Sequence, residues 1–522
     1  MHSLLKSGTL SIVFAVWAMS SDAAASAYYV DYLSGNDANT GTHYTVPWQH
    51  CPGDTSASGN AAITLAAGDT VVFKGGVRYD VASGATLVAR ASGSAASPIT
   101  YLSGHLASPQ WGSSPAVVNG TNASTSAKGV MDWSGRSYLV ANGLGFVGGG
   151  PIAGTDAYGA IGGSWNSGGN VLIQNCSVSN TTASGIYLAG SWDTSAPANF
   201  IVTNCSVHNV ASHGVFLRYG MTNALIVNNI LHDAQTGDPV AVFNYAGGGG
   251  INTGTRILGN DLANAPVKSP IILSGIVVGC LIESNYSRGS FGYSGLDIGT
   301  ALGGGITNLT IRNNVWDVRV NNWQGAMAFI GSSSSPMDGI AIYNNTVLCS
   351  NPPNAAVIGF LGSASGTPYY YNIGITNNIF VQSAGGRAVV MVTKKLDGSP
   401  VADAVTFKCD NNVYVWSNSS TPFVWTGTNM NFGAWKTATG GDADSWTNRP
   451  TFVSSTDLHL AATDAVATGH GFNLYTLFGL DTDSNTRSPS GRWDIGAYVN
   501  VLATGLRPDP ATNLRRVSTP FP

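Results

Sequence analysis

The chain has 522 residues, only 10% of them charged, and a formal net charge of −4. Soluble domains usually carry about 25% charged residues, so this composition excludes a basic surface and we expect no nucleic-acid partner. The 66 glycines and the single glutamate (Glu283) disfavour helices and favour short strands joined by tight turns.

Residues 1–27 have the pattern of a secretory signal peptide. A start containing Lys6, the apolar stretch "LSIVFAVWAM" and the small-residue site "ASA" follow one another in the required order. We expect cleavage after Ala27 and a secreted or periplasmic protein. The apolar stretch is too short to favour a membrane anchor, and no later stretch is long and apolar enough to span a bilayer.

An asparagine-rich motif recurs along the following residues, in forms such as "IVNNIL", "IRNNVW", "IYNNTV" and "ITNNIF". One aligned column recurs at intervals of 24 to 34 residues, which indicates constant strands joined by variable turns. This pattern predicts an all-β parallel solenoid with two or three strands per turn of the coil, or rung, rather than a β-sandwich. Because stacked rungs lie about 4.8 Å apart, asparagine amides at an inward turn can hydrogen-bond along the stack. The column comprises Cys176, Cys205, Asn229, Asn260, Asn285, Asn314, Asn345, Asn378 and Asn412.

Two of the six cysteines, Cys176 and Cys205, occupy this column on adjacent rungs. Their predicted separation is within disulfide range. Two interpretations stay open, a disulfide bond or two small buried thiols. None of the six forms a Cys/His spacing typical of zinc.

A second strand follows in each rung, and its alternation predicts which side chains face outward. In "GIYL", "GVFLR" and "PVAVF" the outward residues include Tyr187, Phe216, Arg218 and Phe243, on three successive rungs. Asp297 in "GLDI" lies three rungs from Arg218. Exposed aromatic rings on a flat sheet suit stacking against sugars; alternatively, these rings pack beneath an overlying loop.

Polar residues near these strands could perform β-elimination on a uronate polymer. That reaction needs a group that neutralises the sugar carboxylate, a base and an acid. The candidate catalytic residues are Arg218, His213, Tyr219, His232 and Asp233, although each histidine could instead cap a turn. The candidate substrate-binding residues are Tyr187, Trp192, Phe216, Asp238, Phe243, Tyr245, Lys268 and Asp297.

Both ends of the chain resemble the pectin-lyase-like superfamily of secreted right-handed parallel β-helix proteins. The start, "YYVDYLSGNDANTGT…PW…GDTVVFKGGVRY", is similar to their N-terminal cap, and "DIGAYV" is similar to their usual ending, with Val499 in place of a glutamate. The resemblance implies a single-stranded right-handed parallel β-helix with an N-terminal cap over residues 28–430. We expect a loop-rich closing segment over 431–500 and a flexible tail over 501–522.

The stretch "HGVFLRYG" also resembles a rung of the β-helix alginate and dermatan-sulfate lyases. In those enzymes the arginine works with a lysine one rung earlier. Here the matching position is Ala189, so the mechanism is not carried over whole, and Lys268 is the nearest substitute.

Three classes of function stay open, since this fold hosts several. The first is a secreted polysaccharide lyase. The second is a glycoside hydrolase, which needs two or three carboxylates across the bond and would use residues such as Asp193, Asp233 and Asp238. The third is a glycan-binding or surface protein without catalysis. In each case we expect a polysaccharide partner and a monomer.

Calcium is the one cofactor that the sequence suggests. "DANTG" (37–41) and "DTDSNTR" (481–487) look like partial calcium loops. The second has Arg492 where a calcium loop carries its last acidic ligand. Both stretches also fit turns of the end caps, so no metal ligand is assigned.

Overall fold

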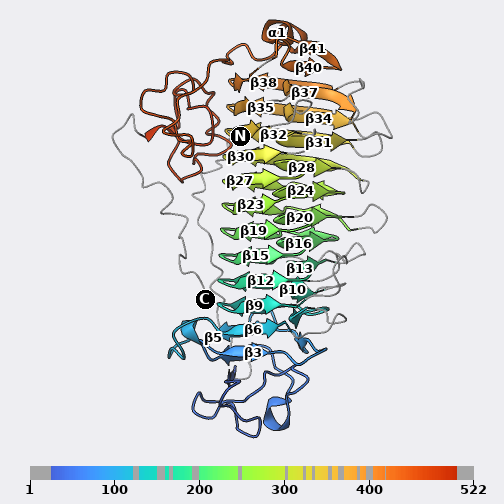
Figure 1. The fold of residues 1–522 in the computed structure, drawn as a ribbon, viewed down its shortest axis with the longest axis vertical. Helices are drawn as coiled ribbons and strands as arrows, with labels where there is room; N and C mark the ends of the chain where they lie inside the picture. The colour runs from blue at the N-terminus through green and yellow to red at the C-terminus, as the bar shows by residue number, and fades with distance from the viewer. Residues whose placement is uncertain are drawn as a thin grey trace, which may run out of the picture.

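The computed structural model describes residues 25–121, 129–149, 159–163, 169–190, 199–244, 250–299, 304–320, 325–331, 336–350, 356–362, 370–384, 388–395, 404–417 and 419–501. Three long parallel sheets, A, B and C, wind into one right-handed coil (Figure 1). Among the described strands only β40 and β41 pair antiparallel. The predicted all-β parallel β-helix is confirmed.

Sheet A contains 16 strands. They are β1 (Ala27–Val30), β2 (Thr70–Phe73), β5 (Ile99–Ser103), β8 (Leu139–Asn142), β11 (Val171–Gln174), β14 (Phe200–Thr203), β18 (Leu225–Val227), β22 (Arg256–Leu258), β26 (Leu281–Glu283), β29 (Ile306–Arg312), β32 (Met337–Tyr343), β35 (Tyr370–Thr376) and β38 (Ala404–Asp410), with the shorter β17 (Met221–Thr222), β21 (Asn252–Thr253) and β25 (Val277–Val278).

Sheet B follows sheet A in each rung and contains 12 strands. They are β3 (Arg78–Asp80), β6 (Val117–Gly120), β9 (Gly145–Gly148), β12 (Ser177–Thr181), β15 (Ser206–Val210), β19 (Ile230–Ala234), β23 (Asp261–Ala265), β27 (Tyr286–Phe291), β30 (Val315–Val320), β33 (Thr346–Ser350), β36 (Ile379–Ala384) and β39 (Val413–Val415).

Sheet C completes the rung and contains 13 strands. They are β4 (Leu87–Val88), β7 (Met131–Asp132), β10 (Gly159–Gly163), β13 (Ser184–Ala189), β16 (Val215–Arg218), β20 (Val240–Phe243), β24 (Ile271–Ser274), β28 (Leu296–Gly299), β31 (Met327–Gly331), β34 (Ala356–Gly362), β37 (Ala388–Lys395), β40 (Phe423–Trp425) and β41 (Thr428–Met430).

The asparagine column forms a buried ladder at the corner between sheets A and B. From Asn229 to Asn378, each side-chain amide nitrogen donates to the amide oxygen of the next ladder asparagine at 2.9–3.1 Å, and the last acceptor is Asn412. The same oxygens accept the backbone N–H groups of the preceding rung at 2.9–3.0 Å. One side-chain type thus satisfies the backbone and its own amide together, as the sequence predicts.

The residue before each ladder position adopts a left-handed backbone, which explains the Asn-Asn dipeptides. The φ angles there are 49–61°, and asparagine tolerates this region better than other non-glycine residues. The first asparagine therefore turns the chain, and the second points into the core. The residues in this left-handed column are Asn175, Asn204, Asn228, Gly259, Ser284, Asn313, Asn344, Asn377 and Asn411.

Cys176 and Cys205 begin the ladder as separate thiols. Cys205 donates its S–H toward the carbonyls of Thr203 and Ile173, at 3.3 and 3.5 Å. Burial raises the pKa of the Cys205 thiol well above its usual value. Of the two interpretations left open, the structure therefore has the pair of small buried thiols.

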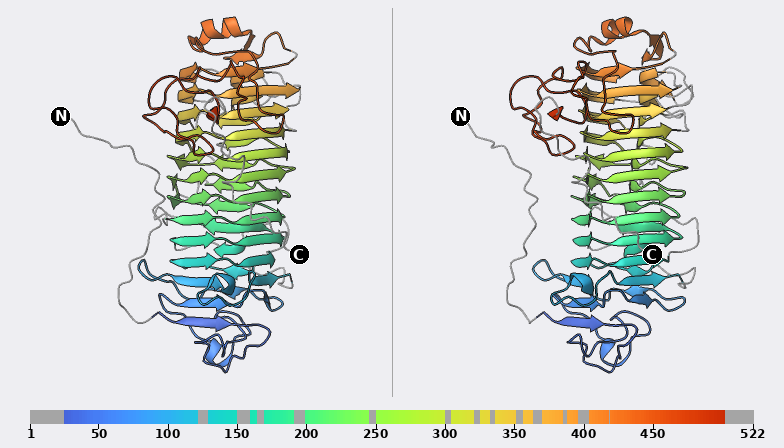
Figure 2. Two further views of the ribbon diagram at one scale, coloured as in Figure 1. Left: turned by 90° about the vertical axis from the view of Figure 1, so that its left-hand side faces the viewer. Right: turned by 60° about the vertical axis from the view of Figure 1, so that its left-hand side comes forward.

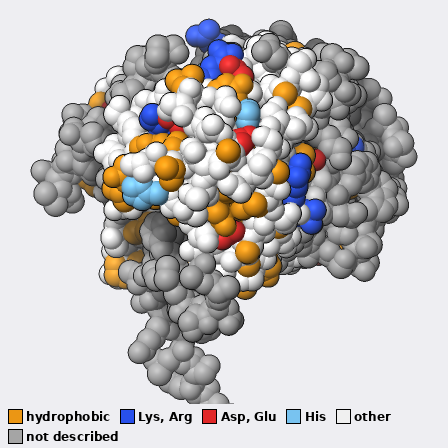
Figure 3. Space-filling view, turned by 90° about the horizontal axis from the view of Figure 1, so that it is seen from below, with side chains coloured by type: hydrophobic (Ala, Val, Ile, Leu, Met, Phe, Trp, Pro, Cys, Tyr) orange, Lys and Arg blue, Asp and Glu red, His pale blue; other side chains and the backbone are white. Residues whose placement is uncertain are grey.

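Both ends of the coil are covered (Figure 2). At the start, β1 pairs with β2, and the buried Trp48 stacks on Tyr28 with ring centroids 4.8 Å apart. At the far end, α1 (Phe432–Thr439) begins at Asn431, whose side chain accepts from Ala434, and buries Trp435. Seen from the N-terminal end, charged side chains are few and scattered among uncharged ones (Figure 3).

The closing segment packs along the side of the coil beside sheets A and B (Figures 1 and 2). The left-handed asparagines hold it there. Asn313, Asn344, Asn377 and Asn411 donate to backbone carbonyls of residues 470–496 at 2.8–3.1 Å. Arg487 is buried among the same groups, and burial lowers its pKa to about 10.

Most of the predicted signal peptide lies outside the described residues, as does nearly all of the 501–522 tail. The predicted cut after Ala27 would fall inside β1. Within the described residues no helix is long and apolar enough to cross a membrane.

Candidate functional site

Sheet C brings the predicted outward residues onto one face, in the predicted register. Tyr187, Phe216, Ala241, Ile272 and Asp297 pair in turn on five successive strands. A second column two residues further along contains Ala189, Arg218 and Phe243. The period-two alternation therefore placed these side chains correctly, and the predicted three-rung distance between Arg218 and Asp297 is confirmed.

The aromatic residues of this face are not an open sugar-stacking strip. Tyr187 and Phe216 are 1% and 0% exposed, so the prediction of exposed rings is wrong for both. They pack edge to face at 5.3 Å, and Phe216 packs in the same way on the half-buried Phe243. The two rings are buried instead in an apolar cluster with Ala189, Tyr219 and Ala241, and ring pairs at this distance stabilise such a cluster.

Arg218 ends β16 at the edge of this cluster, and Tyr219 follows the strand. The Arg218 guanidinium lies 5.7 Å from the centroid of the Phe216 ring and 5.0 Å from that of Tyr219. Tyr219 is buried and has a positive φ of 66°, which turns the chain out of the strand. Arg218 is half-buried, and its guanidinium lies against the two rings.

His213 and Asp238 form a buried pair in the turns before β16 and β20. The Asp238 N–H donates to Nδ1 of His213 at 3.0 Å, and an Asp238 carboxylate oxygen lies 3.2 Å from the same nitrogen. The other carboxylate oxygen accepts the Ser269 N–H at 2.9 Å on the next rung. His213 thus links the turns before β16 and β20.

Asp297 is the most perturbed carboxyl group of this face. It is 5% exposed, and its Oδ1 has no hydrogen-bond partner among the described residues. Burial, and then the charge of Asp238, raise its pKa to about 7, while the Lys268 ammonium opposes the shift. A buried carboxyl group that titrates near neutrality suits proton transfer, which marks Asp297 as more than a substrate contact.

The accessible edge of the site consists of Arg218, Phe243, Ile272 and Lys268. The first three are half-buried, and Lys268 is exposed in the turn before β24, one rung from Asp297. Along this face Lys268 lies one rung from Asp297, and Arg218 lies three rungs from it. The arrangement can hold an acidic sugar and move one proton.

His232 and Asp233 lie elsewhere, which corrects their grouping with Arg218. Both belong to β19 of sheet B. His232 faces Asp261, with Nε2 and a carboxylate oxygen 3.4 Å apart. Asp233 has a φ of 58° and accepts from Asn264 at 3.1 Å. Its backbone repeats that of Asn180, Asn209 and Asn264, each four residues after a ladder position, and this spacing is a signal in the sequence that identifies a turn.

Trp192 and Tyr245, and also Asp193, lie outside the described residues. Both partial calcium loops lie within the described residues. The carboxylate of the first aspartate in each loop accepts hydrogen bonds from backbone N–H groups. Asp37 accepts the N–H groups of Gln49, His50 and Ser58, and Asp481 accepts those of Asp483, Asn485 and Val499. Within the described ranges no group of three or more His, Cys, Asp or Glu could hold a metal ion.

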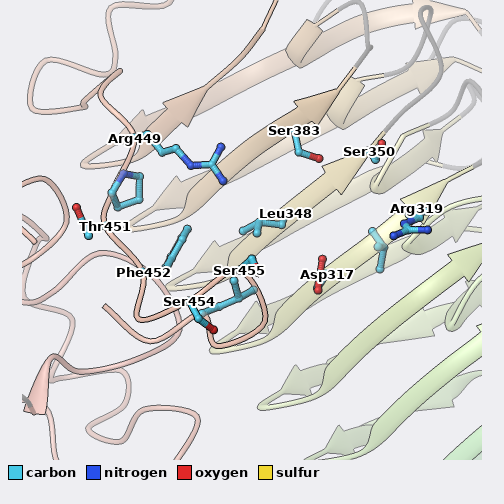
Figure 4. A pocket seen from close by; sticks show the side chains of 13 residues that line it. Asp317, Arg319, Leu348, Ser350, Ser383, Arg449, Thr451, Phe452, Ser454 and Ser455 are labelled. Carbon is cyan, nitrogen blue, oxygen red and sulfur yellow. The ribbon is translucent and has the colours of Figure 1, made fainter. Parts of the chain in front are cut away.

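A groove of about 690 Å³ that the sequence did not predict lies on sheet B, beside the closing segment (Figure 4). Its floor comes from β30, β33 and β36, and its other wall from residues 449–458. Asp317, Arg319 and Arg449 are its ionisable groups. Its wall at residues 449–458 lies more than 60 residues after β36 and more than 120 after β30 in the chain, so no local pattern could have indicated it.

The family model "Right handed beta helix region" matches residues 152–262. No curated protein matches the chain significantly. Among solved structures, XylC in complex with xylose is 10% identical over 91% of this chain and 98% of that chain, with a TM-score of 0.53. Pectate lyase Pel9A is 14% identical over 92% and 97%, with a TM-score of 0.44.

A third solved structure is the GH136 lacto-N-biosidase from Eubacterium ramulus, 11% identical over 81% of this chain and 67% of that chain, with a TM-score of 0.42. At these identities the likeness concerns the fold, and the named proteins include both a lyase and a glycosidase. The protein is a right-handed parallel β-helix.

Proposed function

We propose that this protein is a secreted polysaccharide-degrading enzyme that cleaves a uronate-containing glycan by β-elimination on the outer face of sheet C. The observation that carries the proposal is Asp297, a nearly buried carboxyl group with one unpartnered oxygen and a pKa of about 7. Export rests on the signal-peptide pattern of residues 1–27.

The reaction assigns one role to each group around Asp297. The Lys268 ammonium, one rung away, pairs with the uronate carboxylate and makes the adjacent C5 proton acidic. The Asp297 carboxylate takes that proton, the C4–O4 bond breaks, and a C4–C5 double bond forms. The departing oxygen takes a proton from water. Asp297 therefore acts as the base, a different role from the substrate contact that the sequence suggested.

Arg218 then holds a second uronate rather than the reacting one. Three rungs separate it from Asp297 in the register of sheet C, which is about 14 Å. One sugar cannot reach both groups, but neighbouring units of one chain can. His213, on the same rung as Arg218, positions that end of the site through its contact with Phe216, where the ring centroids are 4.4 Å apart.

Hydrolysis is the second candidate, and one observation favours it. Asp238 contributes to the raised pKa of Asp297, so two carboxyl groups in different environments share this face. Under this mechanism Asp297 would be the acid that protonates the leaving oxygen, and Asp238 the partner carboxylate.

The pH dependence of kcat/KM separates the two mechanisms. Elimination requires the Asp297 carboxylate, so activity rises through a pH of about 7. Hydrolysis requires the protonated acid, so activity falls through the same range. Uronate and neutral glycans are to be tested as substrates, with the ultraviolet absorbance of the unsaturated product marking elimination. Reducing ends without that absorbance would contradict the lyase proposal.

Replacement of Asp297 by asparagine is expected to lower kcat by at least about 100-fold, since the base is lost while the shape is kept. Asp338→Asn, at a half-buried surface position on sheet A, is the matched control and should retain activity. Full activity of Asp297→Asn would remove Asp297 from the mechanism.

Arg218→Ala is expected to raise KM about 10-fold with a smaller change in kcat, because the guanidinium binds a sugar that does not react. Arg256→Ala on β22 of sheet A is the control. Kinetics of both variants on a uronate polymer check this. A loss confined to kcat would place Arg218 at the reacting sugar instead.

A further inference from the structure

The groove on sheet B has the composition of a binding site for an anion. Its three ionisable groups, Arg319, Arg449 and Asp317, give a formal charge of +1 in a chain whose total is −4. Both arginines are exposed, and among the described residues neither has an ion pair or a side-chain hydrogen bond. Guanidinium groups without a carboxylate partner are ready to bind an incoming one.

Hydroxyl groups and apolar surface accompany these cations. Ser350 and Ser455 line the groove, and within the described part of the chain their hydroxyls take part in no hydrogen bond. Leu348 and Leu458 form an apolar floor, and the half-buried Phe452 ring lies against them. An apolar floor with hydroxyl and cationic groups around it suits a sugar ring that carries a carboxylate.

The arginines stand on elements that are already fixed. Arg319 lies on β30, where it pairs in register with Ser350 on β33. Arg449 belongs to the closing segment and extends over the strands of sheet B (Figure 4). Two residues further on, the Thr451 N–H donates to the buried Asp464 at 2.8 Å, and the Thr451 carbonyl accepts the Ala461 N–H at 2.8 Å. Because both walls are preorganised, binding would cost little ordering entropy.

Asp317 adds an acceptor for sugar hydroxyls and leaves the groove with a net positive formal charge. It is half-buried on β30, and burial raises its pKa while Arg319 opposes the shift. In the register of sheet B it pairs with Arg288, which binds Asp261 at 2.9 Å, and His232 also lies beside Asp261. A polar strip thus continues from the groove along sheet B, one rung about every 4.8 Å.

We infer that the groove between sheet B and residues 449–458 is a second saccharide-binding site, one that takes an acidic, uronate-containing oligosaccharide. It lies on a different sheet from Asp297 and Arg218, so it would bind an oligosaccharide independently of them. A binding groove beside a separate reaction face would raise the local concentration of polymer at the coil. The inference concerns binding alone and does not rest on the reaction proposed for sheet C.

The test is calorimetric titration of the full chain with tri-galacturonate and with the neutral galactotriose. Arg218→Ala provides the background in which the sheet C site is weakened. In that background we expect tri-galacturonate to bind, galactotriose to bind at least 5-fold more weakly, and added salt to weaken the acidic ligand. Arg449→Gln should weaken tri-galacturonate about 5-fold, and Arg449→Glu more than 20-fold.

Arg256→Glu, on sheet A, is the matched charge-reversal control and should leave the affinity unchanged. The midpoint of thermal unfolding checks that each variant is folded. If Arg449→Glu does not fold, Arg319→Gln tests the groove in its place. Affinity that survives both Arg449→Glu and Arg319→Gln, or no binding of tri-galacturonate at all, would overturn the inference. Binding that depends on Arg449 while no glycan is cleaved would refute the proposed lyase activity and leave the groove standing.

Discussion

Asn314→Ala is expected to lower the free energy of unfolding by about 4 kcal/mol, because it breaks the ladder at its middle. The Asn314 amide oxygen accepts the Asn285 backbone N–H and side-chain amide, both at 2.9 Å. Its nitrogen donates to Ile282, Arg312 and Asn345 at 2.9–3.0 Å. Alanine leaves these groups without partners, and each buried orphan costs about 1–3 kcal/mol before relaxation.

Asn308→Gly is the control for this prediction. Asn308 is exposed and also has a left-handed backbone, with φ 55°, which glycine adopts without strain. Its replacement should change the unfolding free energy by less than about 0.5 kcal/mol. Since repeat folds can unfold in parts, hydrogen exchange of the amides in β26, β29 and β32 should accompany chemical denaturation. If the two variants change the unfolding free energy equally, the buried amide ladder contributes no more to stability than an exposed turn asparagine does.

Asp297→Asn is expected to stabilise the protein increasingly as the pH rises from about 4 to 7. The pKa of this carboxyl group is about 7 in the folded chain and about 3.9 in an unfolded one. Between these values the unfolded state releases the proton first, so the wild-type folded state loses stability with rising pH. About three pKa units correspond to a cost of about 4 kcal/mol above pH 7, which asparagine avoids.

Chemical denaturation of wild type and Asp297→Asn at pH 4, 5.5, 7 and 8.5 measures this difference. The curves should nearly coincide at the lowest pH, separate through the middle of the range and run parallel above it. Asp338→Asn should show no such separation, because its carboxylate lies at the surface and accepts from Asn372. A pH-independent difference would mean that Asp297 is already ionised at low pH in the fold. If Asp297→Asn is both more stable at neutral pH and less active, the Asp297 carboxyl group serves the reaction and lowers the stability of the wild-type protein.

The sequence was sufficient for the coil because its rules are local. Alternation along "GVFLR" placed Phe216 and Arg218 outward, and the shared column positions placed Asn229 to Asn412 in one ladder. The pairing of residues between neighbouring strands of sheet C then followed from the number of residues between each ladder position and the second strand of its rung. Each of these inferences needs only the pleat of a strand and the stacking of rungs.

The exposure of the outward side chains, and which candidate residues lie together, were harder to predict. Both depend on contacts with residues of other rungs or sheets. Alternation shows that Tyr187 faces outward, but it does not show that the side chain is covered. His232 and Asp233 were grouped with Arg218 because all lie within three rungs, yet the first strand after the ladder belongs to sheet B and the second to sheet C. The raised pKa of Asp297 arises from burial and from Asp238, two rungs away, neither of which its own strand reveals.

The asparagines that anchor the closing segment have a consequence for biosynthesis. Asn313 and Asn344 are translated some 150 residues before Leu480 and Gly496, the partners of their side chains. A ribosome-bound chain can therefore form most of its rungs while this corner of the coil is still uncovered. Only the last residues of the chain cover this corner. Truncation near residue 470 should therefore yield a protein whose coil is folded but which aggregates, rather than an unfolded one.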